Sequence, residues 1–242
     1  MLSKARGLFI TAPLIILATI VMGSLSLFAS FFDSTGRRQH AIARAWSRIL
    51  LAVSGVRVIA EGVKKLDPAK GYVLVANHSS YMDIPVIMAT LPLQFRFFAK
   101  RGLFLIPFLG THLKRAGHVP VVRGDARASL KSMSNGARLI REREVSILLF
   151  PEGGRSLEHL AEFKEGTAYI AIKAAVPAVP IGLEGMRSIL KMHSAFVYPG
   201  TVHLRVGDPI DTSRLTLRDR EALTKELHAR VAELCGESVA VH

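Results

Sequence analysis

The chain has 242 residues, half of them apolar, which is enough for one α/β domain with an added segment. Its 32 basic and 19 acidic residues give a formal net charge of +13. This charge favours an anionic partner such as a lipid headgroup, a phosphorylated substrate, an acidic carrier protein or nucleic acid. The single cysteine, Cys235, excludes an internal disulfide and argues against a thiolate metal site.

An uncharged, apolar stretch lies near the N-terminus. It covers the 25 positions from Leu8 to Phe32, and basic residues flank both ends. As a helix it would be about 37 Å long, which exceeds the ~30 Å hydrocarbon core of a bilayer. A cleaved signal peptide is the competing interpretation, but its apolar region usually covers only about 7–15 residues. We therefore predict a retained membrane anchor that either spans the bilayer or lies in one leaflet.

The next segment has the spacing of an amphipathic helix. Apolar residues recur at positions 42, 45, 46, 49, 50 and 53, while Arg44 and Arg48 lie on other faces. A basic amphipathic helix that carries the only tryptophan, Trp46, is typical of a membrane interface. An ordinary core-packing helix is the alternative. Together the two segments predict a membrane-anchoring helical hairpin over residues 1–55, followed by a globular α/β domain over residues 56–242.

The polar segment from Asn77 to Asp83 lies between two apolar runs. Residues 72–76 have the length and composition of a buried strand, and residues 84–89 those of a helix start with Asp83 as its N-cap. His78 should then lie at the carboxyl edge of a sheet, where open α/β sheets place their chemistry. Asp83 would be close enough to accept a hydrogen bond from the imidazole. A histidine held in this way can act as a general base for an alcohol.

The His-to-Asp spacing alone does not establish this chemistry, because an N-cap aspartate is common for stability alone. The same spacing recurs at His203 and Asp208, where the alternating residues 201–206 predict a strand. Five strand steps of about 3.3 Å would hold those two side chains roughly 16 Å apart. His78 and Asp83 differ from that pair because they bracket a turn, and the remaining motifs must decide between the two interpretations.

Cations follow two further predicted strands. Residues 95–99 form a strand that ends at Lys100, and residues 119–122 form another that ends at Arg123. Both cations should therefore point toward the same edge of the sheet as His78.

An apolar segment, residues 102–110, separates these two strands and is interrupted by Pro107. It includes Phe104 and Phe108 and is apolar on every face. These phenylalanines belong either to the core or to a channel or membrane-facing lip for an acyl chain.

A second polar segment repeats the arrangement of the first. Residues 145–149 predict a buried strand, and an abrupt loop follows with Glu152, Gly153, Gly154 and Arg155. Adjacent glycines let backbone N–H groups approach an anion, and arginine can bind a phosphate in bidentate fashion. Glu152 would either hold Arg155 or bind a hydroxyl group. A plain turn is the alternative, but a turn does not require glutamate and arginine together.

Three further elements complete the predicted domain. Residues 56–62 alternate as a first strand, expected at an edge. Residues 176–181 predict a strand whose two prolines suit an edge or an irregular end. Residues 216–234 predict an amphipathic helix that is capped by Thr216 together with Asp219.

These segments resemble, in order, the sequence blocks of the glycerolipid acyltransferase superfamily, and closely those of its bacterial 1-acylglycerol-3-phosphate acyltransferases. The matching blocks are residues 77–83, residues 98–110 with Arg123, residues 150–156 and residues 179–181. The resemblance covers roughly residues 57–210 and the N-terminal helix pair. Gly154 replaces the usual threonine of the third block, and Arg101 stands where the family often has an acidic residue.

The resemblance implies an α/β fold with a mixed, mostly parallel sheet flanked by helices. It also implies transfer of a fatty acyl group from a thioester to the free hydroxyl of 1-acylglycerol-3-phosphate, which gives phosphatidic acid in phospholipid biosynthesis. His78 would be the catalytic base, and Asp83 would orient it. The phosphate-binding residues that it implies are Lys100, Arg123, Glu152, Gly153 and Arg155, while Phe104 and Phe108 would face an acyl chain or the membrane.

No metal is expected, because nothing near His78 offers a third ligand. No resident cofactor is implied, and the donor substrate would be acyl-CoA or acyl-ACP. The expected partners are therefore a membrane lipid substrate, the membrane surface and, with the second donor, an acyl carrier protein. The expected location is the cell inner membrane, with the catalytic domain on the cytoplasmic face.

Two alternatives stay open. The first keeps the chemistry but uses glycerol-3-phosphate or another lysophospholipid as acceptor. The second is a membrane-tethered basic binding protein that acts on nucleic acid or anionic lipid. The sequence has no nucleic-acid motif and no aromatic stacking pattern, so we expect no nucleic-acid partner.

Overall fold

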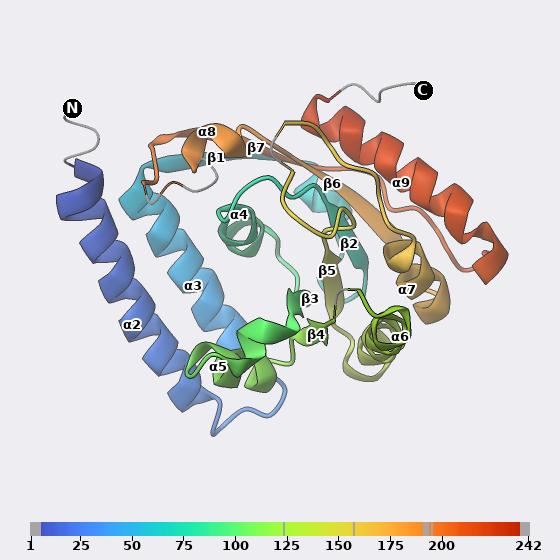
Figure 1. Cartoon of the computed structure of the whole chain (residues 1–242), viewed down its shortest axis with the longest axis horizontal. Helices are drawn as coiled ribbons and strands as arrows, with labels where there is room; N and C mark the ends of the chain where they lie inside the picture. The colour runs from blue at the N-terminus through green and yellow to red at the C-terminus, as the bar shows by residue number, and fades with distance from the viewer. Residues whose placement is uncertain (1–5, 123, 157, 191–193, 195, 238–242) are drawn as a thin grey trace.

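The computed structural model describes residues 6–122, 124–156, 158–190, 194 and 196–237 (Figure 1). In this part of the chain, seven strands form one sheet in the order β1-β7-β6-β2-β5-β3-β4. Neighbouring strands pair in parallel except β6 and β7, which are antiparallel. The strands are β1 Val56–Glu61, β2 Val73–Ala76, β3 Phe95–Lys100, β4 Val119–Val121, β5 Ser146–Leu149, β6 Ala178–Glu184 and β7 Gly200–Val206. The predicted mixed, mostly parallel sheet is confirmed, and so is the edge position of β1.

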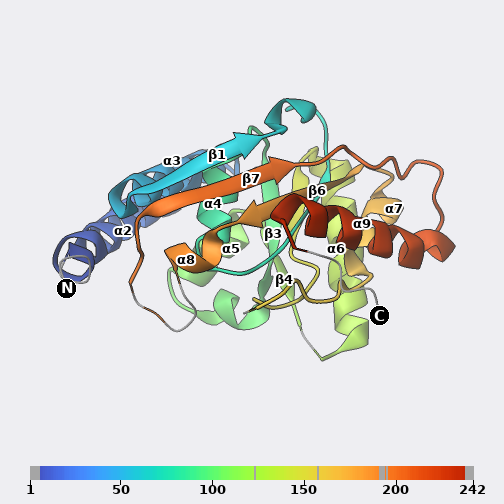
Figure 2. The same ribbon diagram turned by 90° about the horizontal axis from the view of Figure 1, so that it is seen from above.

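Helices cover both faces of this sheet. The α-helices are α2 Ala12–Ala29, α3 Arg37–Ser54, α4 Asp83–Thr90, α5 Leu109–Arg115, α6 Ala126–Arg143, α7 Gly166–Ala174, α8 Met186–Ile189 and α9 Arg220–Cys235. Short helical turns occur at η1 Gly7–Thr11, η2 Val63–Lys65, η3 Arg101–Leu105 and η4 Leu217–Asp219. Figures 1 and 2 show α2 and α3 side by side at one end of the molecule, and α6, α7 and α9 at the other.

The side chains of β2 alternate between two apolar cores, as the twofold period of a strand requires. Leu74 and Ala76 belong to the core beneath α3, α4 and α8, whereas Val73 and Val75 belong to the core beneath α6, α7 and α9. All four side chains are fully buried. The strand therefore lies in the middle of the domain, and the loop that follows it starts from a rigid position.

The two N-terminal helices pack against each other, and the first is apolar over its whole length. Residues 7–29 form a helix of 23 residues that is long and apolar enough to cross a membrane. Only 6% of the most apolar 18-residue stretch of this helix is buried inside the protein. The indole N–H of Trp46 on α3 donates a 3.1 Å hydrogen bond to the Thr19 hydroxyl on α2. This helix pair agrees with the predicted two-helix arrangement.

Arg44 points inward rather than toward a solvated face of α3. Its guanidinium donates hydrogen bonds to the carbonyl oxygens of Met88, Leu91 and Leu93 at 3.3, 2.8 and 2.8 Å. These carbonyls lie at and just beyond the C-terminal end of α4, where a cation is favourable for the helix dipole. The N-terminal helix pair is thus joined directly to α4.

Of the two positions that the prolines of the 176–181 strand suit, an edge and an irregular end, the edge is wrong. The observed strand, β6, lies in the interior of the sheet, between β2 and β7. Pro180 pairs with Val75 of β2, while the ladder with β7 begins only at Ile181. The missing N–H of Pro180 therefore interrupts no bond to β7, and its carbonyl still accepts from Gly207 N–H at 2.9 Å. The proline lies where one ladder ends rather than at a sheet edge.

Candidate active site

His78 and Asp83 form a close pair at the carboxyl end of β2. The ring nitrogen Nδ1 of His78 lies 2.7 Å from Oδ2 of Asp83, whose side chain is fully buried. The same oxygen accepts hydrogen bonds from the backbone N–H groups of Ser79 and Ser80 at 2.8 and 2.9 Å. Because a carboxylate only accepts, the imidazole donates through Nδ1. The other ring nitrogen, Nε2, then keeps a lone pair that can receive a proton.

The predicted N-cap role of Asp83 is wrong. Asp83 is the first residue of α4, the N-cap position is held by Met82, and no side chain caps the helix there. The carboxylate instead turns back into the loop and binds the groups that precede it. Asp83 consequently fixes the His78 ring and the loop backbone together, which an N-cap role would not have allowed.

Phe150 supports the imidazole from the neighbouring strand. The two rings stack with centroids 4.1 Å apart and an interplanar angle of 19°. Phe150 follows directly after β5, which pairs in parallel with β2. The loops after β2 and β5 therefore meet at one edge of the sheet, and the side chain of His78 remains 16% exposed.

Glu152 ties these two loops together. Its Oε1 accepts the backbone N–H of His78 at 2.5 Å. Its Oε2 accepts the Ser156 hydroxyl and, at 3.1 Å, the backbone N–H of Ala161. The two roles considered from the sequence were an interaction with Arg155 and the binding of a hydroxyl group. Among the described residues Glu152 forms no ion pair with Arg155, and both of its oxygens are committed to protein donors.

Arg155 lies against the loop that carries His78. Its guanidinium carbon is 3.5 Å from the centre of the Tyr81 ring. Its Nε is buried and has no hydrogen-bond partner within the described residues. Gly153 has a positive φ of 77°, and a side chain at Gly154 would meet open space. The guanidinium is therefore held by stacking, while donors remain available for an anion beside an open stretch of loop.

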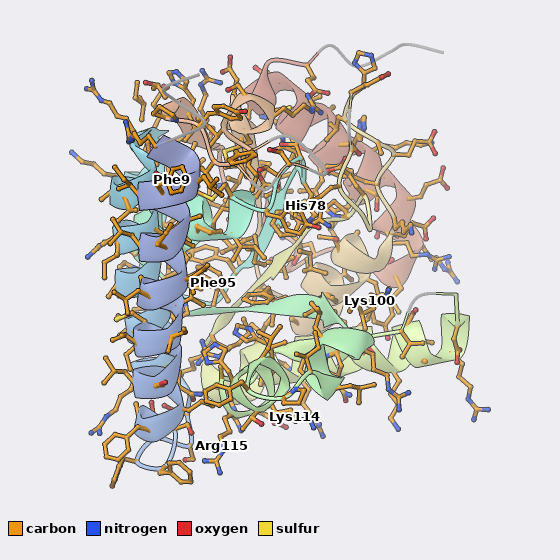
Figure 3. The ribbon with its side chains drawn as sticks, turned by 60° about the vertical axis from the view of Figure 1, so that its left-hand side comes forward. Phe9, His78, Phe95, Lys100, Lys114 and Arg115 are labelled. Atoms are coloured by element: carbon orange, nitrogen blue, oxygen red, sulfur yellow. The ribbon has the colours of Figure 1, made fainter. Side chains whose placement is uncertain are left out.

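The other two predicted cations were expected at the same edge of the sheet. Lys100 is exposed at the carboxyl end of β3, which pairs in parallel with β5, and Figure 3 shows it at the opposite end of that strand from Phe95. Arg123 lies outside the described residues. Lys164, which the sequence did not single out, does reach the loop, and its amine lies against Gly153.

An apolar cavity of about 470 Å³ adjoins the site. It is enclosed by α2, α3, α4, α5 and the segment before α5. Tyr81 lines the cavity and also stacks on Arg155, so the cavity reaches the polar loops at this residue. Phe108 lines the cavity too and is 65% exposed. Phe104 is only 7% exposed and packs with Ala99 and Leu113, so it supports this region from beneath rather than facing it.

No group of three or more His, Cys, Asp or Glu side chains is close enough to hold a metal ion in the described part of the chain. A carboxylate-oriented imidazole at the carboxyl edge of a parallel sheet can take a proton from an alcohol. The fold and this geometry define the class as an α/β protein with a carboxylate-oriented imidazole at the carboxyl edge of its sheet.

Comparison with known proteins defines the family. Residues 57–184, more than half of the chain, match the Acyltransferase family. The chain belongs to this family, and the membership expected from its sequence blocks is confirmed.

Individual proteins resemble the chain over most of its length. A chloroplastic 1-acyl-sn-glycerol-3-phosphate acyltransferase of Arabidopsis thaliana is 31% identical over 230 residues, which cover 92% of this chain and 64% of that protein. The mouse 1-acyl-sn-glycerol-3-phosphate acyltransferase alpha is 32% identical, with 70% of this chain and 60% of that protein covered. The chain thus spans less than two thirds of the length of these two curated relatives.

A solved structure agrees with the fold. The crystal structure of the 1-acyl-sn-glycerophosphate (LPA) acyltransferase from Thermotoga maritima superimposes with a TM-score of 0.74 at 25% sequence identity. The match covers 96% of this chain and 97% of that one. The similarity therefore includes the N-terminal helix pair as well as the sheet.

Proposed function

We propose that this chain transfers a fatty acyl group from an acyl thioester to the free hydroxyl of 1-acylglycerol-3-phosphate, which gives phosphatidic acid for phospholipid biosynthesis. The observation that carries the proposal is the 2.7 Å contact between His78 and Asp83, which leaves Nε2 of the imidazole free to act as a base. The activity named for the relatives in Arabidopsis, mouse and Thermotoga supports the same reaction.

In this mechanism the acceptor hydroxyl attacks the thioester carbonyl directly. Nε2 of His78 takes the hydroxyl proton as the new C–O bond forms, a contribution of about 10²–10⁴-fold in rate. Asp83 stabilises the imidazolium that results. Collapse of the tetrahedral intermediate breaks the C–S bond and releases a thiolate, whose conjugate acid has a pKa of about 8.5, so no strong general acid is needed. The proton on His78 then leaves with the thiol.

Cys235 does not offer a competing route through an acyl-cysteine. It is buried at the end of α9, where desolvation and the nearby Glu237 raise its pKa to about 11. A thiol with so high a pKa supplies little thiolate at neutral pH. The direct attack therefore needs only groups at the loops after β2 and β5.

The acceptor phosphate would bind to Arg155, with Lys100 and Arg123 as further proposed ligands and with Glu152 and Gly153 shaping the loop. The support for Arg155 is its unpartnered Nε and its stacking on Tyr81. An acyl chain would lie in the 470 Å³ apolar cavity, with Phe108 at its exposed margin. Tyr81 is shared by the cavity and the cation, so one lipid can place its chain and its headgroup on either side of it.

The N-terminal helix pair would place the reaction at a membrane surface. We propose that residues 1–55 anchor the domain of residues 56–242 at the cell inner membrane, on its cytoplasmic face. The exposed apolar length of the 7–29 helix supports membrane attachment. A lipid acceptor could then enter sideways from the bilayer, and the donor would arrive from water as acyl-CoA or acyl-ACP.

The test is acyl transfer by the purified full-length chain in vesicles. Labelled acyl groups are offered from coenzyme A and from acyl carrier protein. The acceptors are 1-acylglycerol-3-phosphate, glycerol-3-phosphate and a lysophospholipid with a larger headgroup. We expect 1-acylglycerol-3-phosphate to be the best acceptor and His78→Ala to lose at least about 10²-fold in rate. Parental activity in H78A would overturn the proposed mechanism, and preference for another acceptor would reassign the substrate.

A further inference from the structure

Lys164 occupies the space that a side chain at position 153 would need. A β-carbon on Gly153 would lie 2.7 Å from Lys164 Nζ, 3.2 Å from Cε and 3.5 Å from Cδ. The end of the lysine therefore runs across the glycine at the centre of the 150–156 loop. Two properties of Gly153 permit this approach, namely its positive φ of 77° and its lack of a β-carbon.

The backbone holds Lys164 in this place. Its N–H donates a 3.0 Å hydrogen bond to the carbonyl of Pro151, two residues before Gly153. The helix α7 begins at Gly166, immediately afterwards, and belongs to the core beneath the sheet. The lysine thus enters the site from a fixed segment, although its own side chain is exposed.

The charge of Lys164 is not neutralised by the protein around it. Within the described residues no carboxylate oxygen lies within 4.0 Å of its amine. The adjacent Glu165 is paired with Arg220. Glu152, the acid of the same loop, accepts from His78, Ser156 and Ala161. An ammonium placed over an open glycine loop without a counter-ion favours an anion there.

We propose that Lys164 is a further phosphate-binding residue of the acceptor site, acting from the Gly153 side of the loop while Arg155 acts from the Tyr81 side. This inference rests on the proposed function. A phosphate monoester carries a charge of about −1.5 to −2 at pH 7, so two cations match it better than one. Lys164 would thereby favour an acceptor with a free phosphate monoester over a phosphodiester, whose headgroup phosphate carries a single negative charge.

The kinetic test compares Lys164→Gln and Lys164→Arg with Lys173→Gln. Lys173 is a matched control, because its amine lies 5.9 Å from the Tyr169 ring near the end of α7 and away from the loop. We expect K164Q to raise the KM for 1-acylglycerol-3-phosphate about tenfold, the usual effect of losing a charge-assisted hydrogen bond. The kcat and the KM for the thioester should stay within about twofold, and K164R should restore the acceptor KM. A loss of kcat without a change in acceptor KM would overturn the proposal, as would a K173Q effect of equal size.

A binding measurement separates this proposal from the proposed reaction. In the H78A background, which should not turn over, 1-acylglycerol-3-phosphate in detergent micelles is titrated onto chains with and without K164Q. We expect binding to be about tenfold weaker with K164Q, whether or not the parental chain catalyses acyl transfer. Equal affinities would overturn the role of Lys164 and leave the proposed reaction intact.

Discussion

The backbone N–H of His78 donates a 2.5 Å hydrogen bond to Oε1 of Glu152, a residue 74 positions further along the chain. The return contact runs from Ser156 N–H to the His78 carbonyl at 2.8 Å. The loop that carries Arg155 therefore binds both the backbone N–H and the backbone carbonyl of the proposed catalytic base. The same two hydrogen bonds fix the backbone of His78 and the position of the proposed phosphate-binding loop relative to each other.

Glu152→Gln should separate these loops without emptying the space between them. An amide keeps one acceptor oxygen, but its NH₂ must face donors that now point at Oε1 or Oε2. We expect the free energy of unfolding to fall by about 1–3 kcal/mol, because a buried hydrogen bond is lost. We also expect kcat to fall by about 10–100-fold, because the base shifts relative to the acceptor hydroxyl. Denaturant unfolding and initial rates measure the two effects. Glu142→Gln is the control, since Glu142 is exposed on α6 and pairs with Arg138 at 3.9 Å. Parental kcat in E152Q would contradict this account.

Asp83→Asn should leave the loop folded but remove the charge that would stabilise a protonated His78. The N–H groups of Ser79 and Ser80 and Nδ1 of His78 all contact Oδ2, so an amide oxygen in that position can still accept from all three. The NH₂ then takes the position of Oδ1, which is buried and has no partner within the described residues, and the neutral amide stabilises an imidazolium less than the carboxylate does. We expect kcat to fall by about 10²–10⁴-fold with the melting temperature nearly unchanged. A D83N enzyme that retains more than a tenth of the parental rate would show that the dyad is not needed.

Much of this arrangement could be predicted, because it is local in sequence. A five-residue apolar run, a short polar turn and a helix start bring His78 and Asp83 together whatever the rest of the chain does. The capping box of Thr216 and Asp219 is equally local and was predicted correctly, although it opens the short turn η4 that leads into α9. The position of Lys100 and Arg123 at the ends of predicted strands gave the further expectation that both cations lie at the same edge of the sheet as His78.

The features that the sequence could not reveal all depend on contacts between distant segments. Nothing in the periodicity indicates that Glu152 accepts from His78 rather than from Arg155, because the pairing of β2 with β5 decides it. The prolines of the 176–181 strand leave an edge and an irregular end open, because a rule about proline alone carries no information on where the ladder with β7 begins. Lys164 was missed because its approach requires the absent β-carbon of Gly153, eleven residues earlier.

Low pH should lower the stability of the packing between α3 and the sheet. His40 on α3 accepts the N–H of Phe95 through Nε2 at 3.3 Å, which requires a neutral ring. Burial, with the charges of Arg96 and Arg44, lowers the pKa of His40 to about 3. The unfolded chain, with a histidine pKa near 6.5, binds the proton more readily below that pH, so stability is present above about pH 6.5 and is lost as pH falls toward 3.

At pH 4 this one group should remove about 3 kcal/mol of stability. His40→Gln keeps an acceptor for Phe95 N–H but cannot titrate, so its stability should vary less between pH 7 and pH 4. Denaturant unfolding at several pH values measures both slopes. Parallel slopes for the two proteins would exclude His40 as the group responsible.

The end of α9 holds the loop behind Glu152 through a single carboxylate. Oε1 of Glu237 accepts Arg187 Nη1 at 2.7 Å, and Oε2 accepts the backbone N–H of Leu160. Leu160 directly precedes Ala161, whose N–H binds Glu152. Glu237 itself is positioned by the helix end, where Gly236 has a φ of 73° and Glu237 N–H donates to Ala232 at 3.0 Å. Glu237 is therefore linked to His78 through three hydrogen bonds, those donated by the N–H groups of Leu160, Ala161 and His78, and we infer that it is a positioning residue.

Glu237→Gln should weaken this support without reaching the substrate. We expect kcat to fall by roughly 3–10-fold, because a neutral amide loses the charge-assisted bond to Arg187 and one of its two acceptors. The acceptor KM should change less than in K164Q, since no contact to the phosphate is removed. Glu184→Gln is the matched control, because Glu184 also pairs with an arginine at 2.7 Å, Arg205, but does not hold the loop. If E184Q and E237Q lower kcat equally, the effect belongs to general stability and Glu237 has no particular role in placing the base.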